Sequence, residues 1–68
     1  MYINHRQAAQ SLRDNLDDWT IHDMKFELNA GMNRRQFHRR FRDCTKYQKT
    51  IDCLYEMLCT EMCIYIKP

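Results

Sequence analysis

The stretch GMNRRQFHRRFRDCT, residues 31–45, concentrates the side chains of this chain that are best suited to binding chemistry. It holds five arginines and one histidine, with two phenylalanines among them. Guanidinium groups are permanent cations that donate paired hydrogen bonds to phosphate oxygens and to guanine edges. Residues 34–49 carry seven cations against one carboxylate, a net charge of +6, whereas residues 1–33 and 50–68 each carry −2. This distribution predicts an anionic partner for one segment of the chain.

The same stretch has the pattern of a short amphipathic helix. With about 100° between successive residues, Phe37, Phe41 and Cys44 fall on one side of a helix over residues 34–44. The arginines on the opposite side are Arg35, Arg39 and Arg42. We therefore expect two buried rings to anchor this helix to the protein, while the guanidinium groups face outward.

A helix with such an outward face has the size and chemistry to bind double-stranded DNA. The major groove admits one α-helix, arginine pairs with guanine through two hydrogen bonds, and further cations neutralise phosphates. The predicted DNA-binding residues are Arg34, Arg35, His38, Arg39, Arg42, Lys46 and Lys49. A solvated charged surface without a partner is the simpler interpretation, and the high local charge argues against it.

The remaining reactive side chains do not form a recognisable catalytic or metal-binding pattern. The cysteines at positions 44, 53, 59 and 63 lack the C-x-x-C spacing of zinc and redox sites. Cys59 and Cys63 would share one face of a continuous helix, where we interpret them as small buried hydrophobic residues, with a thiophilic metal or a partner contact as the alternative. The three histidines are interpreted as solvated. We therefore expect no enzyme activity, no metal site and no cofactor.

The elements that position these residues are predicted to be helices throughout. The chain of 68 residues has one glycine and one proline, and no segment alternates apolar and polar residues as a strand does. Residues 1–68 are therefore expected to form a single all-α domain, a compact bundle of about four helices over residues 5–18, 21–29, 34–44 and 46–66. Each begins near a pair resembling a capping box: Asn4 with Gln7, Thr20 with Asp23, Asn33 with Gln36, and Thr45 with Gln48.

The fourth predicted helix is long for so small a domain and carries a continuous apolar stripe. The stripe consists of Ile51, Leu54, Tyr55, Leu58, Met62 and Tyr65. Two interpretations stay open for residues 46–66. The stripe is the core of the bundle, or it remains partly uncovered and pairs with the same helix of a second copy in a homodimer.

Residues 20–45 have the order of a helix-turn-helix motif, with Gly31 in the turn. The segment AGMNRRQFHRRFRDCT resembles the recognition segment of AraC-type helix-turn-helix transcriptional regulators. The positions that match the family pattern are Gly31, Met32, Arg35, Phe37, Arg39, Arg40, Phe41, Arg42 and Thr45. The segment TIHDM at 20–24 is similar to the start of the preceding helix in that family. The resemblance implies DNA binding by the second helix of the motif. It does not imply effector binding, since the family carries two such motifs and this chain has one.

Two functions from different classes follow from these patterns. The first is a small DNA-binding transcriptional regulator that inserts the basic helix into the major groove. The alternative is a small inhibitor, encoded by a phage or another mobile element, that binds an acidic host protein through the basic helical face. RNA is a further anionic partner for an arginine-rich helix. Without an export signal or a long apolar run, we expect a cytoplasmic protein with no membrane contact.

Overall fold

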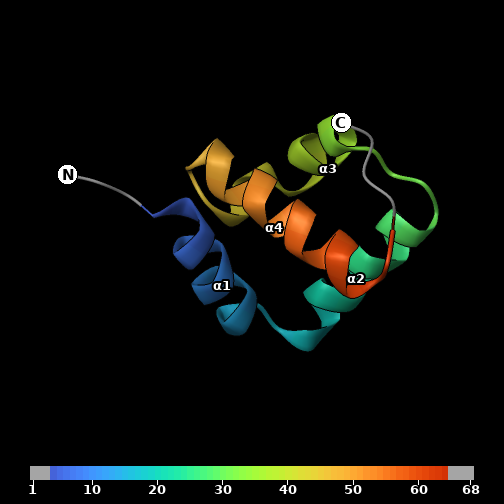
Figure 1. The fold of residues 1–68 in the computed structure, drawn as a ribbon, viewed down its shortest axis with the longest axis horizontal. Helices are drawn as coiled ribbons and strands as arrows, with labels where there is room; N and C mark the ends of the chain where they lie inside the picture. The colour runs from blue at the N-terminus through green and yellow to red at the C-terminus, as the bar shows by residue number, and fades with distance from the viewer. Residues whose placement is uncertain (1–3, 65–68) are drawn as a thin grey trace.

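The computed structural model describes residues 4–64 of the chain. Within these residues there are four α-helices, α1 (His5–Asn15), α2 (Asp18–Asn29), α3 (Arg34–Phe41) and α4 (Gln48–Glu61), with a 3₁₀ turn, η1 (Arg42–Cys44), between α3 and α4. No strand occurs in this range, and the all-α prediction is confirmed. Helix α4 runs through the middle of the molecule, and α1 and α3 both pack against it (Figure 1).

The core lies where the apolar sides of the four helices meet. Helix α1 contributes Ala9, α2 contributes Met24 and Leu28, and α3 contributes Phe37 and Phe41. The buried apolar residues of α4 are Ile51, Leu54, Tyr55, Leu58 and Cys59. The stripe predicted for the last helix is therefore covered within the chain as far as Leu58. An uncovered stripe, which was the reason to consider a homodimer, is not found in the described part of α4.

Helix α1 begins where the sequence predicts and ends earlier. Its first turn is capped by Asn4, whose side-chain oxygen accepts a hydrogen bond from the backbone N–H of Gln7 at 3.0 Å. The predicted end at Asp18 is wrong, because the helix ends at Asn15. The two residues that follow are needed to turn the chain and to cap the next helix.

Helix α2 starts three residues before the predicted start at Ile21, and the predicted cap at Thr20 is wrong. The true cap is Asp17, whose carboxylate accepts a hydrogen bond from the backbone N–H of Thr20 at 2.6 Å. This bond lowers the pKa of Asp17, and a negative charge at this end also interacts favourably with the helix dipole. Trp19, which follows directly after the predicted first helix over residues 5–18, is consequently in the first turn of α2.

The turn between α2 and α3 is closed by the glycine that the sequence predicts. Gly31 has a φ of 105°, a left-handed conformation that glycine adopts without a steric cost. The N–H of Gly31 bonds to the carbonyl of Leu28, and the N–H of Met32 bonds to the carbonyl of Glu27, both at 3.1 Å. This pair of bonds is a Schellman motif, which satisfies the last carbonyl groups of α2 and fixes the direction in which the chain leaves it.

Helix α3 begins with the one predicted capping box that forms completely. The side chain of Asn33 accepts the N–H of Gln36 at 2.9 Å, and the side chain of Gln36 accepts the N–H of Asn33 at 3.1 Å. The helix is shorter than predicted, because the α-helical part ends at Phe41 and the segment from Arg42 to Cys44 tightens into 3₁₀ geometry. Such tightening is common in the last turn of a helix.

The predicted start of the fourth helix at Lys46 is wrong by two residues. Thr45, expected to cap this helix, instead accepts the N–H of Tyr47 at 3.4 Å. Helix α4 begins at Gln48, with Tyr47 in the cap position and no side-chain cap.

The predicted end of this helix at Ile66 is also wrong, because α4 ends at Glu61. Cys63 adopts a left-handed φ of 57°, and the N–H of Ile64 bonds back to the carbonyl of Cys59 at 2.9 Å. This is a second Schellman motif, formed without glycine. The expectation that Cys59 and Cys63 share a helical face is therefore wrong, since Cys59 is buried and Cys63 is exposed beyond the helix end. Tyr65 lies outside the described residues.

Candidate nucleic-acid interface

Helix α3 is held to the protein by its two phenylalanine rings. Phe37 is fully buried and Phe41 nearly so, with their ring centroids 4.9 Å apart. The edge of one ring meets Tyr55 of α4, with 5.4 Å between the centroids of Phe37 and Tyr55. Aromatic pairs in such tilted geometry add to the stabilisation from burial. The prediction that Phe37 and Phe41 anchor this helix is confirmed, and Cys44 on the same side is half-buried.

The opposite side of α3 and η1 presents three arginines to solvent. Arg35, Arg39 and Arg42 are all exposed. Within residues 4–64, none of the three forms an ion pair with a carboxylate of the protein. Lys46 and Lys49, at the start of α4, are exposed and likewise unpaired in this range. Five cations are therefore available to an external anion.

These five cations line two adjoining depressions between α3 and the start of α4. The first, of about 410 Å³, is lined by Arg35, His38, Arg39, Arg42, Thr45, Lys46, Gln48 and Ile51. The second, of about 590 Å³, is lined by Arg34, Arg35, His38, Gln48, Lys49 and Asp52. We call the surface formed by Arg35, Arg39, Arg42, Lys46 and Lys49 the basic groove.

Two polar residues of these depressions were not predicted as site residues. Thr45 and Gln48 were assigned to a capping box, and the structure places both along the basic groove instead. The start of α4 lies there as well, with no side-chain cap and no acidic residue in its first turn. Uncapped N–H groups at a helix start carry partial positive charge, so they add to the attraction for an anion.

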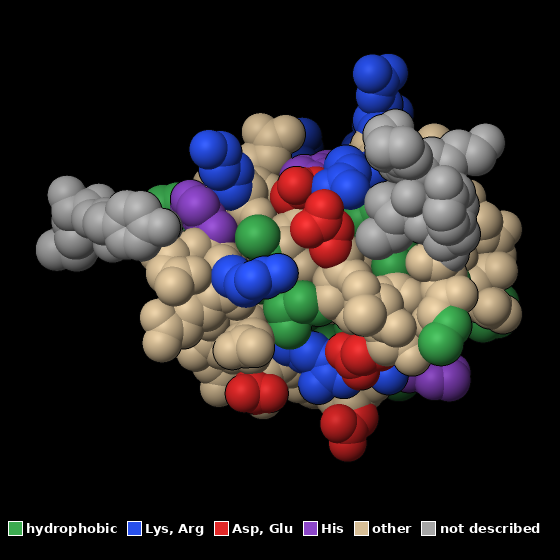
Figure 2. Space-filling model, viewed as in Figure 1, with side chains coloured by type: hydrophobic (Ala, Val, Ile, Leu, Met, Phe, Trp, Pro, Cys, Tyr) green, Lys and Arg blue, Asp and Glu red, His purple; other side chains and the backbone are tan. Residues whose placement is uncertain are grey.

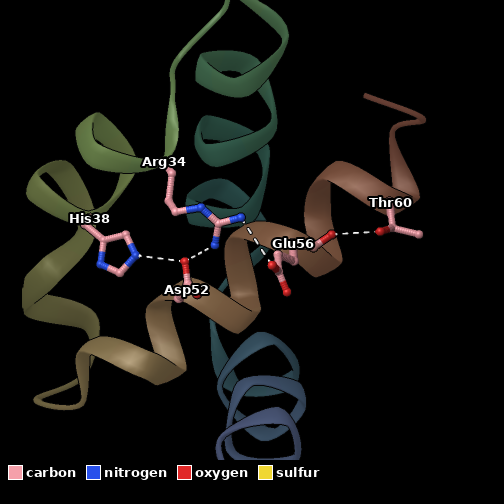
Figure 3. Close-up of polar contacts among 5 residues, drawn as sticks. All are labelled: Arg34, His38, Asp52, Glu56 and Thr60. Carbon is pink, nitrogen blue, oxygen red and sulfur yellow. Dashed lines mark hydrogen bonds and ion pairs between the residues drawn. The ribbon is translucent and has the colours of Figure 1, made fainter. Parts of the chain in front are cut away.

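Two of the predicted DNA-binding residues, Arg34 and His38, contact carboxylates of the protein itself, and the side chain of Arg34 remains 38% exposed. Both reach from α3 to Asp52 of α4, and the guanidinium also approaches Glu56 (Figure 3). Arg34 donates hydrogen bonds to Asp52 and, at 3.2 Å, to Glu56. Nε2 of His38 lies 3.3 Å from Asp52, and the guanidinium carbon of Arg34 lies 5.0 Å from the centre of the Tyr55 ring.

This cluster is electrostatically coupled. Partial burial alone would raise the pKa of Asp52, but hydrogen bonds from Arg34 and His38 outweigh it and lower the pKa. The hydrogen bond to Asp52 in turn raises the pKa of Arg34. Because each bond joins α3 to α4, the cluster orients the basic helix on its support.

A second arginine outside the basic groove joins α3 to α2. Arg40 donates a hydrogen bond to Asp23 at 3.1 Å, and its guanidinium carbon lies 5.3 Å from the centre of the Phe41 ring. Helix α3 is therefore tied on one side to α4 and on the other to α2. The sequence offers no local sign of either contact, because each joins residues at least 14 positions apart.

On the face viewed in Figure 2, some Lys and Arg side chains lie beside Asp and Glu side chains, and others stand apart from them. The ion pairs between arginine or lysine and carboxylates within residues 4–64 all lie outside the basic groove. One such contact, at the end of α4, joins Glu61 to Arg13 and, at 3.7 Å, to Lys25. Charges that are neutralised in this way attract distant anions weakly.

The part of the chain that the structure describes contains neither a metal-ligand cluster nor a membrane-spanning helix. Among residues 4–64, no group of three or more His, Cys, Asp or Glu side chains is placed to hold a metal ion. No helix in the same range combines the length and apolar character that crossing a bilayer requires. A scan against protein-family models and searches of curated proteins and of solved structures found no match to this chain.

Proposed function

We propose that this chain is a small DNA-binding transcriptional regulator in which α3 enters the major groove. The observation that carries the proposal is the basic groove: five cations on one surface that form no ion pair within residues 4–64, two of them on α3, which is anchored by buried rings, and one on the adjoining η1. Like charges repel, so leaving them without internal partners has a cost that a bound polyanion removes.

The roles of the individual residues follow from their positions. Arg35, Arg39 and Arg42 on the outer side of α3 and η1 are assigned to base edges and nearby phosphates. Lys46 and Lys49, together with the uncapped start of α4, are assigned to flanking phosphates. Arg34 and His38 hold α3 in position through Asp52. The resemblance of residues 20–45 to AraC-type regulators supports the same function.

A mobility-shift assay with duplex DNA tests the proposal. Replacing Arg39 with alanine is expected to weaken binding at a specific site by about 1–3 kcal/mol. Arg6→Ala is the matched control, because it removes the same charge from an exposed arginine on α1. Arg6 does not line the basic groove. If Arg39→Ala and Arg6→Ala bind DNA equally well, the assignment of α3 as the recognition helix is wrong.

Competition separates DNA from the other anionic partners. A regulator of the proposed kind is displaced from labelled duplex DNA by unlabelled duplex, and much less by single-stranded RNA of the same length. Preference for RNA would replace the DNA assignment with an RNA-binding one. Tight binding to one acidic protein with no measurable affinity for either nucleic acid would favour the inhibitor alternative.

A further inference from the structure

The outer side of α2 exposes two large aromatic side chains. Trp19 is 77% exposed and Phe26 is 65% exposed. They are seven residues apart, so they lie two turns apart on the same side of the helix, and His22, also exposed, lies between them. The opposite side of α2 carries Met24 and Leu28, which are buried in the core.

Leaving these rings in water is costly for a chain of this size. The chain has one tryptophan and three phenylalanines, and a domain of 68 residues has little apolar surface to spare for its core. Two exposed rings aligned on one helix are the arrangement used by helices that place anchors at i, i+3 and i+7 into an apolar surface. Tryptophan and other aromatic residues also carry much of the binding energy at protein interfaces.

The charges around the rings indicate what kind of surface fits. Residues 17–29 contain four carboxylates and one lysine, a net charge of −3 along the sequence, and one of these carboxylates, Asp23, is paired with Arg40 of α3. Asp18 and Glu27 form no ion pair within the described residues. Nucleic acids and anionic bilayers would be repelled by this surface. A second copy that paired through its own α2 would bring carboxylates against carboxylates.

We propose that Trp19, His22 and Phe26 form a protein-docking face. The partner of this face carries an apolar strip bordered by lysine or arginine. Helix α2 has 12 residues, a length of about 18 Å, which spans a contact of two to three helical turns. The face shares no residue with the basic groove and is independent of the DNA-binding proposal.

The single tryptophan makes the proposal directly testable with the full chain. The probe is a helical model peptide with a leucine strip flanked by lysines, and its counterpart has glutamate in place of every lysine. Titration with the leucine–lysine peptide is expected to shift Trp19 emission to the blue with saturation, because the indole leaves water. The leucine–glutamate peptide is expected to give no shift.

Variants separate docking from simple charge attraction. Phe26→Ser is expected to weaken binding of the leucine–lysine peptide at least about tenfold. Replacing Asp18 with asparagine and Glu27 with glutamine is expected to weaken it several-fold and to reduce the discrimination between the two peptides. Arg35→Ala, on the basic groove, is expected to leave the affinity unchanged. Circular dichroism verifies that each variant retains its helices.

Three results would overturn the proposal. The first is equal binding of the two peptides, or no emission shift with either. The second is unchanged affinity in Phe26→Ser. The third is a blue shift of Trp19 emission that grows with protein concentration in the absence of peptide, together with a dimer in sedimentation that Phe26→Ser abolishes. That result would identify the face as a self-association surface.

Discussion

The slope of DNA-binding affinity against salt concentration is expected to reflect the number of unpaired cations in the basic groove. Each phosphate that is neutralised contributes about −0.9 to the slope of log affinity against log salt concentration, so five cations give a slope of about −4.5. If Arg34 and Arg40 also bound phosphates, seven cations would give about −6.3. With the smaller slope, affinity falls roughly 500-fold between about 50 and 200 mM salt.

Fluorescence anisotropy with a labelled duplex of random sequence measures this slope. Arg35→Ala is expected to change the slope to about −3.6, because one phosphate contact is lost. Arg40→Ala is the matched control on the same helix, since its guanidinium already pairs with Asp23 at 3.1 Å, and it is expected to leave the slope near the wild-type value.

Two outcomes would refute the reasoning. Affinity that does not change with salt would mean that the basic groove binds no polyanion. A wild-type slope near −6, or an equal loss of slope in Arg35→Ala and Arg40→Ala, would mean that the internal ion pairs open when DNA binds. The seven cations of residues 34–49 would then not divide into five that are available to DNA and two, Arg34 and Arg40, that stay paired within the protein.

Three further predictions concern the scaffold, each measured by urea unfolding. Phe37→Ala is expected to reduce the free energy of unfolding by about 3–5 kcal/mol, because the ring is fully buried between α3 and Tyr55 of α4. Cys63→Gly is expected to increase it by up to about 1 kcal/mol, because glycine relieves the left-handed φ of 57°, while Cys63→Ala does not. Asp52 has a lowered pKa in the folded state, so its contribution is present above the unfolded-state pKa of about 3.9 and is lost as pH falls through the folded-state value. Asp52→Asn is expected to be less stable than the wild type near neutral pH, with the difference shrinking below about pH 4.

Each scaffold prediction has a contrary result. A loss below 1 kcal/mol in Phe37→Ala would mean that α3 is not anchored by this ring. Equal stability of Cys63→Gly and Cys63→Ala would show that the left-handed conformation of residue 63 causes no strain at the end of α4. A constant difference between wild type and Asp52→Asn from pH 7 to pH 3 would show that the carboxylate is not coupled to Arg34 and His38.

Much of the helical framework was predictable from neighbouring residues. The cap at Asn4, the capping box of Asn33 with Gln36, and the left-handed Gly31 depend on residues within one turn of each other, and all three formed. The two wrong caps, at Thr20 and Thr45, fit the same local pattern. At Thr20, an aspartate three residues earlier provided a better acceptor, and at Thr45 the chain needed two more residues before α4 began.

The sequence alone determined the division of α3 into a buried aromatic side and a charged side. That division follows from the helical period, which relates each side chain to its own helix axis. Only the tertiary structure decided that Arg34 and Arg40 are engaged by Asp52 and Asp23, whereas Arg35 and Arg39 stay open to solvent. The helical period does not specify which residues of other helices lie next to a given helix. The position of a carboxylate 17 or 18 residues away along the chain is set by how the helices pack.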